Sequence, residues 1–200
     1  RLFNEQFAIG CKLRVIQMQA WSRDMLWADT GLKWVATSPN MPYARTTLVY
    51  LATGLVDEGG VNNGIGTARP FEYAGGYGYD PAAYRDVLAA RKIPGVEFEP
   101  VDWSPAKGFW SGKTLRGVTI NVTDPRTFPS VRTAIELLAA ARAQGKYHVA
   151  SGHEKIMDRD WGTDTVRLAL DTGTSPDAIV ASWQPGLHAF RTLRSKYLLY

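Results

Sequence analysis

The chain has 200 residues, of which 45% are hydrophobic and 21% charged, and its formal net charge is +4. Its 7 tryptophans, 9 tyrosines and 7 phenylalanines exclude an intrinsically disordered chain, because so much apolar surface has to be buried. No window is apolar over the roughly 18 residues that a transmembrane helix needs, and no long run of like charges favours nucleic acid as a partner.

The first residue is Arg1, with neither a methionine nor an apolar signal segment at the start. We therefore expect the sequence to come from the middle of a longer gene product. The single cysteine, Cys11, excludes an intrachain disulfide, and we expect it to be a small buried side chain rather than a nucleophile.

The first 80 residues contain few clear elements. Lys12–Met18 alternates apolar and polar side chains and predicts a strand. Thr46–Leu51 is β-branched and apolar, and its pattern fits either a strand or a short helix. Residues 54–80 are crowded with glycine, which indicates a loop whose backbone turns tightly or approaches another group closely. The loop contains no glycine-rich phosphate-binding motif.

Regular elements are clearer from Asp80 onward. Asp80 and Pro81 predict the start of a helix that ends at Pro94. The remaining predicted elements are strands at Val96–Val101 and Leu115–Thr123, and helices at residues 129–145, at residues 163–173 and from Pro176 to Phe190. The predicted fold class is therefore α/β, of the α+β type, with a mixed sheet, about three covering helices and long loops rich in glycine and aromatic residues.

The histidines do not form a metal-binding pattern. His148, His153 and His188 lack the spacing of zinc motifs, and the chain has no cysteine pair. The serine motifs of acyl transfer are also absent. We therefore predict no metal site and no cofactor.

Carboxylates in the loops are the remaining candidates for chemistry. Cleavage of a glycosidic bond uses two carboxyl groups, one of which is kept protonated by an apolar or like-charged environment. Asp57, Glu58, Glu72 and Asp124 lie in or beside the loops. The alternative is that each of them faces solvent or caps a turn, as Asp124 before Pro125 is suited to do.

Aromatic residues gather in the same loops. Sugar rings stack on aromatic faces, so the group favours the wall of a carbohydrate cleft. The alternative is that each ring pins a long loop to the core. These residues are Trp21, Trp27, Trp34, Trp103, Trp110, Tyr43, Tyr73, Tyr77 and Tyr79.

Several stretches, taken together and in order, resemble a known family. The most specific are Ser38–Pro42 and Gly66–Glu72, and further matches are Asp29–Leu32, Pro105–Gly108, Val122–Asp124, Ala181–Trp183 and Tyr197–Tyr200. Through these motifs the chain resembles the family first described as a domain of unknown function, DUF1343, which is associated with exo-acting β-N-acetylmuramidases. The resemblance extends over nearly the whole chain.

The resemblance implies a bacterial cell-wall glycosidase that removes N-acetylmuramic acid from peptidoglycan fragments. It implies a Rossmann-like N-terminal half that carries the main catalytic carboxylate, and a smaller C-terminal half that closes the cleft. We expect residues 1–200 to be a single C-terminal domain that lacks the Rossmann-like half. The catalytic residue of this chain is then unknown, and the expected substrate-binding residues are Asn40, Thr67, Arg69 and Glu72. Arg69 is a natural partner for a carboxylate on the substrate.

The same resemblance suggests partners and a location. The expected partners are a peptidoglycan-derived sugar, the upstream domain of the same gene product and proteins of the cell envelope. The expected location is extracytoplasmic, in the periplasm, outside the cell or associated with the envelope.

The loop before Thr67 departs from the family pattern. The family commonly reads Ser-Glu-Gly-Arg-Gly-Thr, whereas Asn62–Thr67 reads Asn-Asn-Gly-Ile-Gly-Thr. Asn63 and Ile65 thus replace an acidic and a basic residue. This difference leaves a second hypothesis open, in which the chain is a non-catalytic binding or scaffold subunit of a cell-envelope complex.

Overall fold

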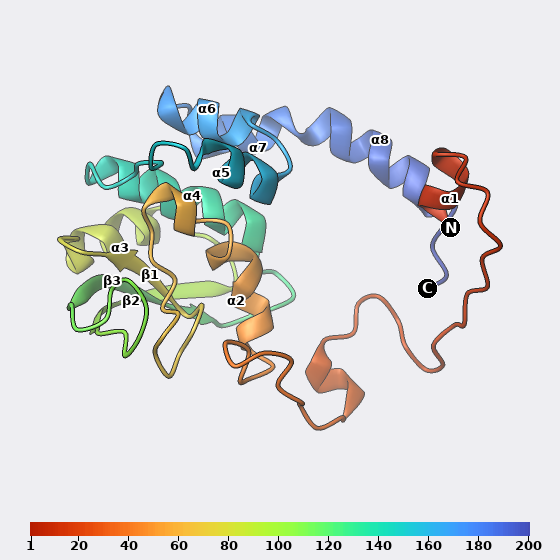
Figure 1. Cartoon of the computed structure of the whole chain (residues 1–200), viewed down its shortest axis with the longest axis horizontal. Coiled ribbons are helices and arrows are strands. Elements are labelled where there is room, and N and C mark those ends of the chain that lie inside the picture. Colours follow the sequence, from red (N-terminus) through yellow and green to blue (C-terminus); the bar gives the residue numbers. More distant parts are fainter. The chain divides into compact units, whose positions relative to one another are not determined.

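A computed structural model describes residues 1–200, which divide into two compact units (Figure 1). The larger unit is Val35–Ile179, and the smaller unit combines Arg1–Trp34 with Val180–Tyr200. The candidate functional site lies in the larger unit, which is described first.

A three-stranded sheet forms the centre of the larger unit. Its strands are β1 (Tyr73–Gly76), β2 (Val96–Trp103) and β3 (Leu115–Val122), in the order β1-β3-β2. The α/β fold class is confirmed, but the sheet is not of the mixed type that we expected, because both pairings are antiparallel. Helix α3 connects β1 to β2, yet these strands are not neighbours, so no parallel pair forms.

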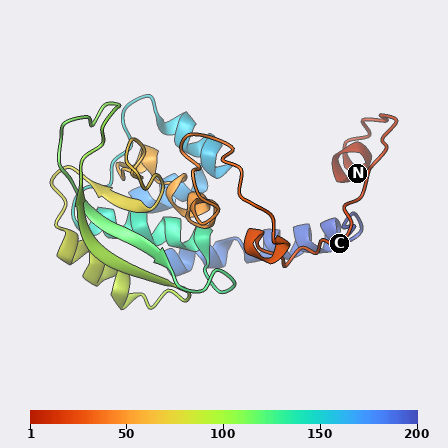
Figure 2. The ribbon, with the colours of Figure 1, turned by 90° about the horizontal axis from the view of Figure 1, so that it is seen from below.

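Helices cover the sheet and extend the unit beyond it. Helix α3 lies against β2 and β3, and α4 lies against α2 and α3 (Figures 1 and 2). More helices form than the three or so that we expected, because the chain after α4 is divided into short helices. The helices that begin in this unit are α2 (Thr46–Thr53), α3 (Pro81–Ala90), α4 (Ser130–Ala143), α5 (Glu154–Trp161), α6 (Thr165–Asp171) and α7 (Pro176–Ser182), with a 3-10 helix, η2, at Asp57–Gly59.

Helix α3 begins as predicted and anchors the core. Asp80 accepts hydrogen bonds from two backbone N–H groups of the first turn at 3.0 and 3.1 Å, and Pro81 follows it. Tyr84 and Leu88 are fully buried, and the Tyr84 hydroxyl donates to the carbonyl oxygen of Leu137 at 2.8 Å. This bond connects α3 to α4 in the interior and satisfies a polar group that burial would otherwise leave without a partner.

The strands and helices predicted between residues 96 and 173 are confirmed in type and lie close to the predicted bounds. The helix predicted from Pro176 to Phe190 is instead divided into α7 and α8 (Gln184–Ser195). Strand β3 buries Val118 and Ile120, as the alternation predicts. Thr119, on the opposite face, is buried as well, because β3 is the central strand. Helix α4 buries Ile135 and Leu138 at helical spacing.

The smaller unit contains α1 (Leu2–Gln6), a 3-10 helix, η1 (Trp27–Thr30), and α8 (Gln184–Ser195). The predicted strand at Lys12–Met18 is wrong: the segment is irregular and exposed, because no other strand lies beside it. Cys11 is exposed too, which contradicts the expectation of burial.

The last residues of the chain pack against the first ones within the smaller unit. The Tyr197 hydroxyl accepts from the Gln6 amide at 2.7 Å. The Tyr200 hydroxyl accepts from the backbone N–H of Met18 at 2.6 Å, and its ring meets that of Trp21 edge to face at 4.9 Å. The two ends of the chain therefore form one unit although they are far apart in sequence.

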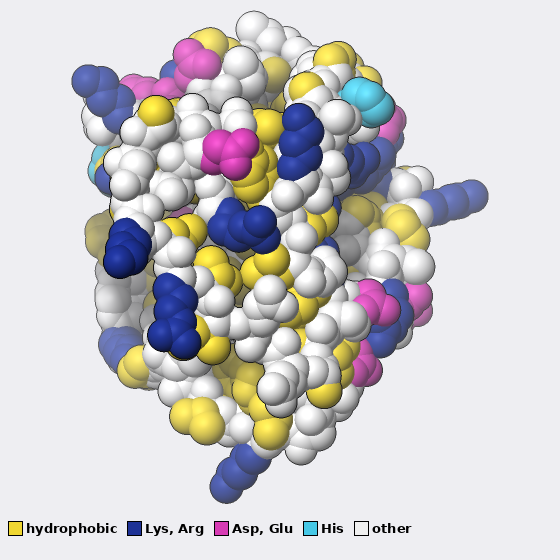
Figure 3. All heavy atoms as spheres, turned by 90° about the vertical axis from the view of Figure 1, so that its right-hand side faces the viewer, with side chains coloured by type: hydrophobic (Ala, Val, Ile, Leu, Met, Phe, Trp, Pro, Cys, Tyr) yellow, Lys and Arg dark blue, Asp and Glu magenta, His cyan; other side chains and the backbone are white.

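Large hydrophobic side chains reach the surface in both units. Figure 3 shows hydrophobic side chains at the surface, interspersed with lysines and arginines. In the smaller unit the exposed ones include Phe3, Phe7, Ile9, Leu13, Val15, Ile16, Met18 and Leu32. None of the helices combines the length and the apolar character that crossing a membrane requires.

Candidate functional site

A pocket of about 600 Å³ opens in the larger unit where four segments meet. Helix η2 supplies two acidic side chains, and the turn after β1 and the loop between β2 and β3 supply aromatic rings. The segment from the end of α4 to the start of α5 supplies a lysine and two histidines. The side chains with functional groups or rings are Asp57, Glu58, Asn62, Tyr77, Tyr79, Phe109, Trp110, Lys146, His148 and His153. We call this site the acidic–aromatic pocket.

Two adjacent carboxyl groups of the acidic–aromatic pocket have different surroundings. Glu58 pairs with His153 across an Oε2–Nδ1 distance of 2.6 Å, which joins η2 to the start of α5. Asp57 keeps exposed surface, but the pocket walls crowd its carboxyl group and remove water from it. This loss of solvation, and after it the negative charge of Glu58, raises the pKa of Asp57. Asp57 is therefore the better suited of the two to hold a proton.

Glycines let the backbone segments of the pocket approach one another. Gly60 has a φ of +80°, and a Cβ there would lie 2.7 Å from His148 Nδ1 and 2.9 Å from the carbonyl oxygen of Lys146. Gly78 has a φ of +73°, and a Cβ there would lie 3.0 Å from Lys146 Nζ. The glycine density of residues 54–80 is thus explained in part by close approach to segment 146–148, as the sequence predicted.

Aromatic rings form another part of the lining of the acidic–aromatic pocket, and we call them the aromatic wall. Tyr77 and Phe109 are 67% and 81% exposed, and the ring of Phe109 meets that of Trp110 edge to face at 4.9 Å. Lys113 Nζ lies 5.7 Å and 5.3 Å from the centres of the Phe109 and Trp110 rings. Exposed aromatic rings of this kind offer flat faces on which the C–H groups of a sugar can stack.

Other aromatic residues fix the loops instead. The rings of Tyr73 and Trp103 stack at 5.0 Å, and the Trp103 indole N–H donates to Asn62 Oδ1 at 3.3 Å. Tyr79 is buried, and its hydroxyl donates to the carbonyl oxygen of Gly60 at 3.0 Å. For these residues the alternative interpretation, in which a ring pins a loop, agrees with the structure.

Glu72 is buried and lies between two arginines. It accepts hydrogen bonds from Arg45 Nε at 3.0 Å and from Arg69 Nε at 2.7 Å. Its carboxylate is thus occupied within the protein, while the two arginine side chains remain 56% and 39% exposed beside a smaller pocket. The structure brings Arg69 and Glu72 together, and Glu72 positions both arginines.

Of the other two predicted substrate-binding residues, Thr67 belongs to the same loop as Arg69, whereas Asn40 lines neither pocket. Thr67 Oγ1 accepts from the backbone N–H of Arg69 at 3.0 Å and donates to the carbonyl oxygen of Gly64 at 2.7 Å, so it stabilises the same loop. The backbone N–H of Asn40 donates to Ser38 Oγ at 3.2 Å. Asn40 lines neither the acidic–aromatic pocket nor the pocket beside the arginines.

The loop Asn62–Thr67, which departs from the family pattern, is stabilised by neutral groups although it has neither the acidic nor the basic residue of that pattern. Asn63 is buried, and its amide accepts from the Ile65 N–H at 3.4 Å and donates to the carbonyl oxygen of Thr53 at 3.5 Å. Ile65 is exposed. Asn63 therefore stabilises the loop through neutral hydrogen bonds.

Sequence reasoning missed part of the pocket. Lys146 and His153 follow α4 and precede α5, far along the chain from η2, and no motif links them to it. Asp124 accepts from Thr127 Oγ1 at 2.8 Å and from the Arg126 N–H at 3.0 Å, so it caps a turn, as its alternative interpretation states. No group of three or more His, Cys, Asp or Glu side chains is arranged to hold a metal ion.

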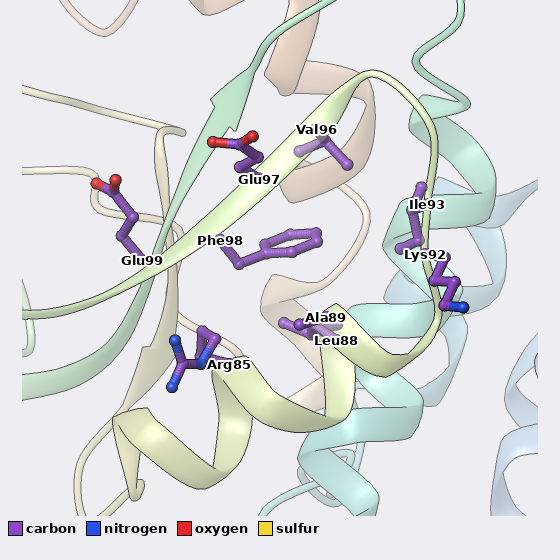
Figure 4. Close-up of a pocket in the computed structure, with 9 residues that line it drawn as sticks. All are labelled: Arg85, Leu88, Ala89, Lys92, Ile93, Val96, Glu97, Phe98 and Glu99. Atoms are coloured by element: carbon purple, nitrogen blue, oxygen red, sulfur yellow. The ribbon is translucent and has the colours of Figure 1, made fainter.

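A second pocket of about 320 Å³, between α3 and β2, has a different character. Its floor is aliphatic and aromatic, and the ring of Phe98 points toward Leu88 and Ala89 of α3 (Figure 4). Glu97 and Glu99 leave the strand on the other side from this ring (Figure 4). Phe98 is the one aromatic lining residue of this second pocket, whereas the acidic–aromatic pocket has four.

Comparison with known proteins places this fold and sequence in one family. The model of the exo-β-N-acetylmuramidase NamZ C-terminal region matches residues 48–200, and the model of its N-terminal region matches residues 1–45. A relative described as peptidoglycan β-N-acetylmuramidase NamZ, from Bacillus subtilis (strain 168), is 32% identical over 203 aligned residues. That alignment covers 100% of this chain and 48% of the relative.

Two crystal structures of DUF1343 family proteins from Bacteroides fragilis NCTC 9343 are similar in fold. One has a TM-score of 0.91 at 23% identity and covers 100% of this chain and 54% of the other. The second has a TM-score of 0.54 at 20% identity and covers 82% of this chain and 43% of the other. The chain thus spans about half the length of these relatives. The sequence resemblance is confirmed, and the chain belongs to the NamZ (DUF1343) family.

Proposed function

We propose that this chain supplies the sugar-binding part of an exo-acting β-N-acetylmuramidase, and that the acidic–aromatic pocket receives the N-acetylmuramic acid unit of a peptidoglycan fragment. The observation that carries the proposal is that two carboxyl groups and exposed aromatic rings line one pocket. Carbohydrate sites combine these features, because ring faces cover the sugar's C–H groups and carboxylates accept from its hydroxyls. Membership in the family supports the choice of substrate.

Within this proposal, the two carboxyl groups have separate roles. Glu58 is held by His153 and accepts hydrogen bonds from sugar hydroxyls. Asp57, whose pKa is raised, is the side chain in the pocket best prepared to donate a proton. The main catalytic carboxylate belongs to an upstream domain that completes the cleft, and the whole protein acts outside the cytoplasm.

The binding part of the proposal is tested by calorimetric titration of the 200-residue chain with N-acetylmuramic acid. Trp110→Ala is expected to weaken binding about tenfold, since it removes a stacking ring. Trp27→Ala, which alters an aromatic pair of the smaller unit, is the matched control and is expected to leave the affinity unchanged. Equal affinities for the wild type and Trp110→Ala would contradict the assignment of this pocket.

The catalytic part requires the full-length gene product. The full-length protein is expected to release a chromogenic group from an N-acetylmuramoyl substrate. The rate of this release is expected to be lower in the Asp57→Asn variant. The second hypothesis, a non-catalytic binding or scaffold subunit, is favoured by the neutral Asn63 and Ile65 in the loop where the family carries charges. Sugar binding without turnover, together with co-purification in an envelope complex, would support that second hypothesis.

A further inference from the structure

The acidic–aromatic pocket contains one basic side chain of the lysine or arginine type, Lys146. N-acetylmuramic acid differs from N-acetylglucosamine by a lactyl ether that ends in a carboxylate. A cationic side chain is well suited to recognise this carboxylate, and the sequence pointed to Arg69 for this role. In the structure Arg69 binds the buried carboxylate of Glu72 at 2.7 Å and lines a different pocket.

Lys146 is held in place by its backbone. Its N–H donates to the carbonyl oxygen of Ala141 at 2.9 Å, one turn back in α4, and its own carbonyl oxygen lies 3.0 Å from His148 Nδ1. Its ammonium group lies over the turn at Gly78, where the absence of a side chain leaves room for it. The residue is thus fixed at the pocket while its side chain forms no ion pair within the protein.

The other basic side chains near the pocket interact with groups of the protein itself. Lys113 lies over the Phe109 and Trp110 rings and does not line the pocket. His153 is bound to Glu58 at 2.6 Å. Because the carboxylate of Glu58 lies on the η2 side of the pocket, a ligand carboxylate is better accommodated where Lys146 lies, beside the turn after β1.

We propose that Lys146 is a specificity-determining residue that binds the lactyl carboxylate of N-acetylmuramic acid and thereby selects it over N-acetylglucosamine. This inference rests on the proposed function of the pocket. A charge-assisted hydrogen bond between ammonium and carboxylate has the strength for such selection. The sugar ring itself is bound by the aromatic wall, so the two parts of the ligand depend on different residues.

The test is a titration of the full chain with each of the two sugars. The wild type is expected to bind N-acetylmuramic acid about tenfold more tightly than N-acetylglucosamine. Lys146→Met, which keeps the length of the side chain, is expected to lower the affinity for N-acetylmuramic acid to that for N-acetylglucosamine and to leave the latter unchanged. Lys155→Met, an exposed position on α5 outside the pocket, and Lys113→Met are expected to keep the preference.

The possible failures are distinguishable. Equal binding of both sugars by the wild type, or an undiminished preference in Lys146→Met, would overturn the role of Lys146 while leaving the proposed function intact. Loss of the preference in Lys113→Met alone would assign the carboxylate to that lysine instead. Binding of neither sugar would overturn the proposed function and, with it, this inference.

Discussion

Two buried glutamates of the larger unit are each held by two arginines, but their surroundings differ. Glu72, at the approach to β1, is 3% exposed, and Glu136, in the middle of α4, is 2% exposed. Around Glu136, Arg91 and Arg132 donate to the carboxylate and also bind a second acid, Asp177 of α7. That cluster balances two acids with two bases.

The cluster around Glu72 is not balanced in this way. Arg45 and Arg69 share the one carboxylate, which leaves an excess of positive charge on half-exposed guanidinium groups. Arg69 also lies 5.6 Å above the ring of Tyr73, which stacks on Trp103. The comparison indicates that the cluster at Glu136 joins helices, whereas the one at Glu72 positions a loop that leads to the acidic–aromatic pocket.

Removal of the glutamate from the balanced cluster is expected to have the largest effect on stability. Glu136→Ala deletes three charge-assisted hydrogen bonds and opens a cavity in the most buried helix. The free energy of unfolding should fall by about 3 kcal/mol, measured by urea denaturation. Affinity for N-acetylmuramic acid should be unchanged in the folded variant. A loss below about 1 kcal/mol would show that the helices do not depend on this cluster.

Removal of Glu72 is expected to have a smaller effect on stability and a larger one on binding. Glu72→Ala deletes two charge-assisted hydrogen bonds, and the two arginines can then turn to solvent. The free energy of unfolding should therefore fall by about 2 kcal/mol. Because the freed Arg69 no longer supports Tyr73, we expect a few-fold weaker sugar affinity by calorimetry. Unchanged affinity would remove the link between this cluster and the pocket.

The smallest expected effects concern pH, and they have opposite signs in the Glu136 cluster and in the acidic–aromatic pocket. Hydrogen bonds from Arg91 and Arg132 lower the pKa of Asp177, so its stabilisation is present above its ordinary pKa and is lost as the pH falls through the lowered value. The pKa of Asp57 is raised, so its contribution is full below its ordinary pKa and is lost as the pH rises through the raised value.

Two amide variants separate these effects in unfolding measurements over a series of pH values. Asp177→Asn should be less stable than the wild type at neutral pH and equal to it in strong acid. Asp57→Asn should be as stable as the wild type, or more so, at neutral pH. The same sign of change in both variants would contradict this contrast between the Glu136 cluster and the acidic–aromatic pocket.

The sequence predicted the elements after Asp80 well, because local signals determine them. Asp80 and Pro81 fix the start of α3, and the alternation in Leu115–Thr123 fits the inner and outer faces of β3. Lys12–Met18 has the alternation of a strand, but a strand needs a partner and none lies beside it. Strand β1 was missed because it is four residues long and half glycine, and its pairing with β3 comes from tertiary contact.

The candidate site was less accessible to sequence reasoning. Glu58 was a candidate by composition, but its partner His153 lies 95 residues further along the chain, and only the fold brings them together. Glu72 was expected to face substrate, and its burial depends on two arginines at different distances in sequence. The sequence likewise favoured Arg69 as the partner of a substrate carboxylate, but it does not reveal that Arg69 pairs with Glu72 in the folded chain.

Mapping of the ligand by NMR tests the central claim most directly. In a titration of the isotope-labelled chain with N-acetylmuramic acid, we expect the largest chemical-shift changes at η2, at Tyr77, at Trp110 and in segment 145–153. Shifts confined to Arg45, Arg69 and their neighbours, or to the groove between α3 and β2, would contradict the account.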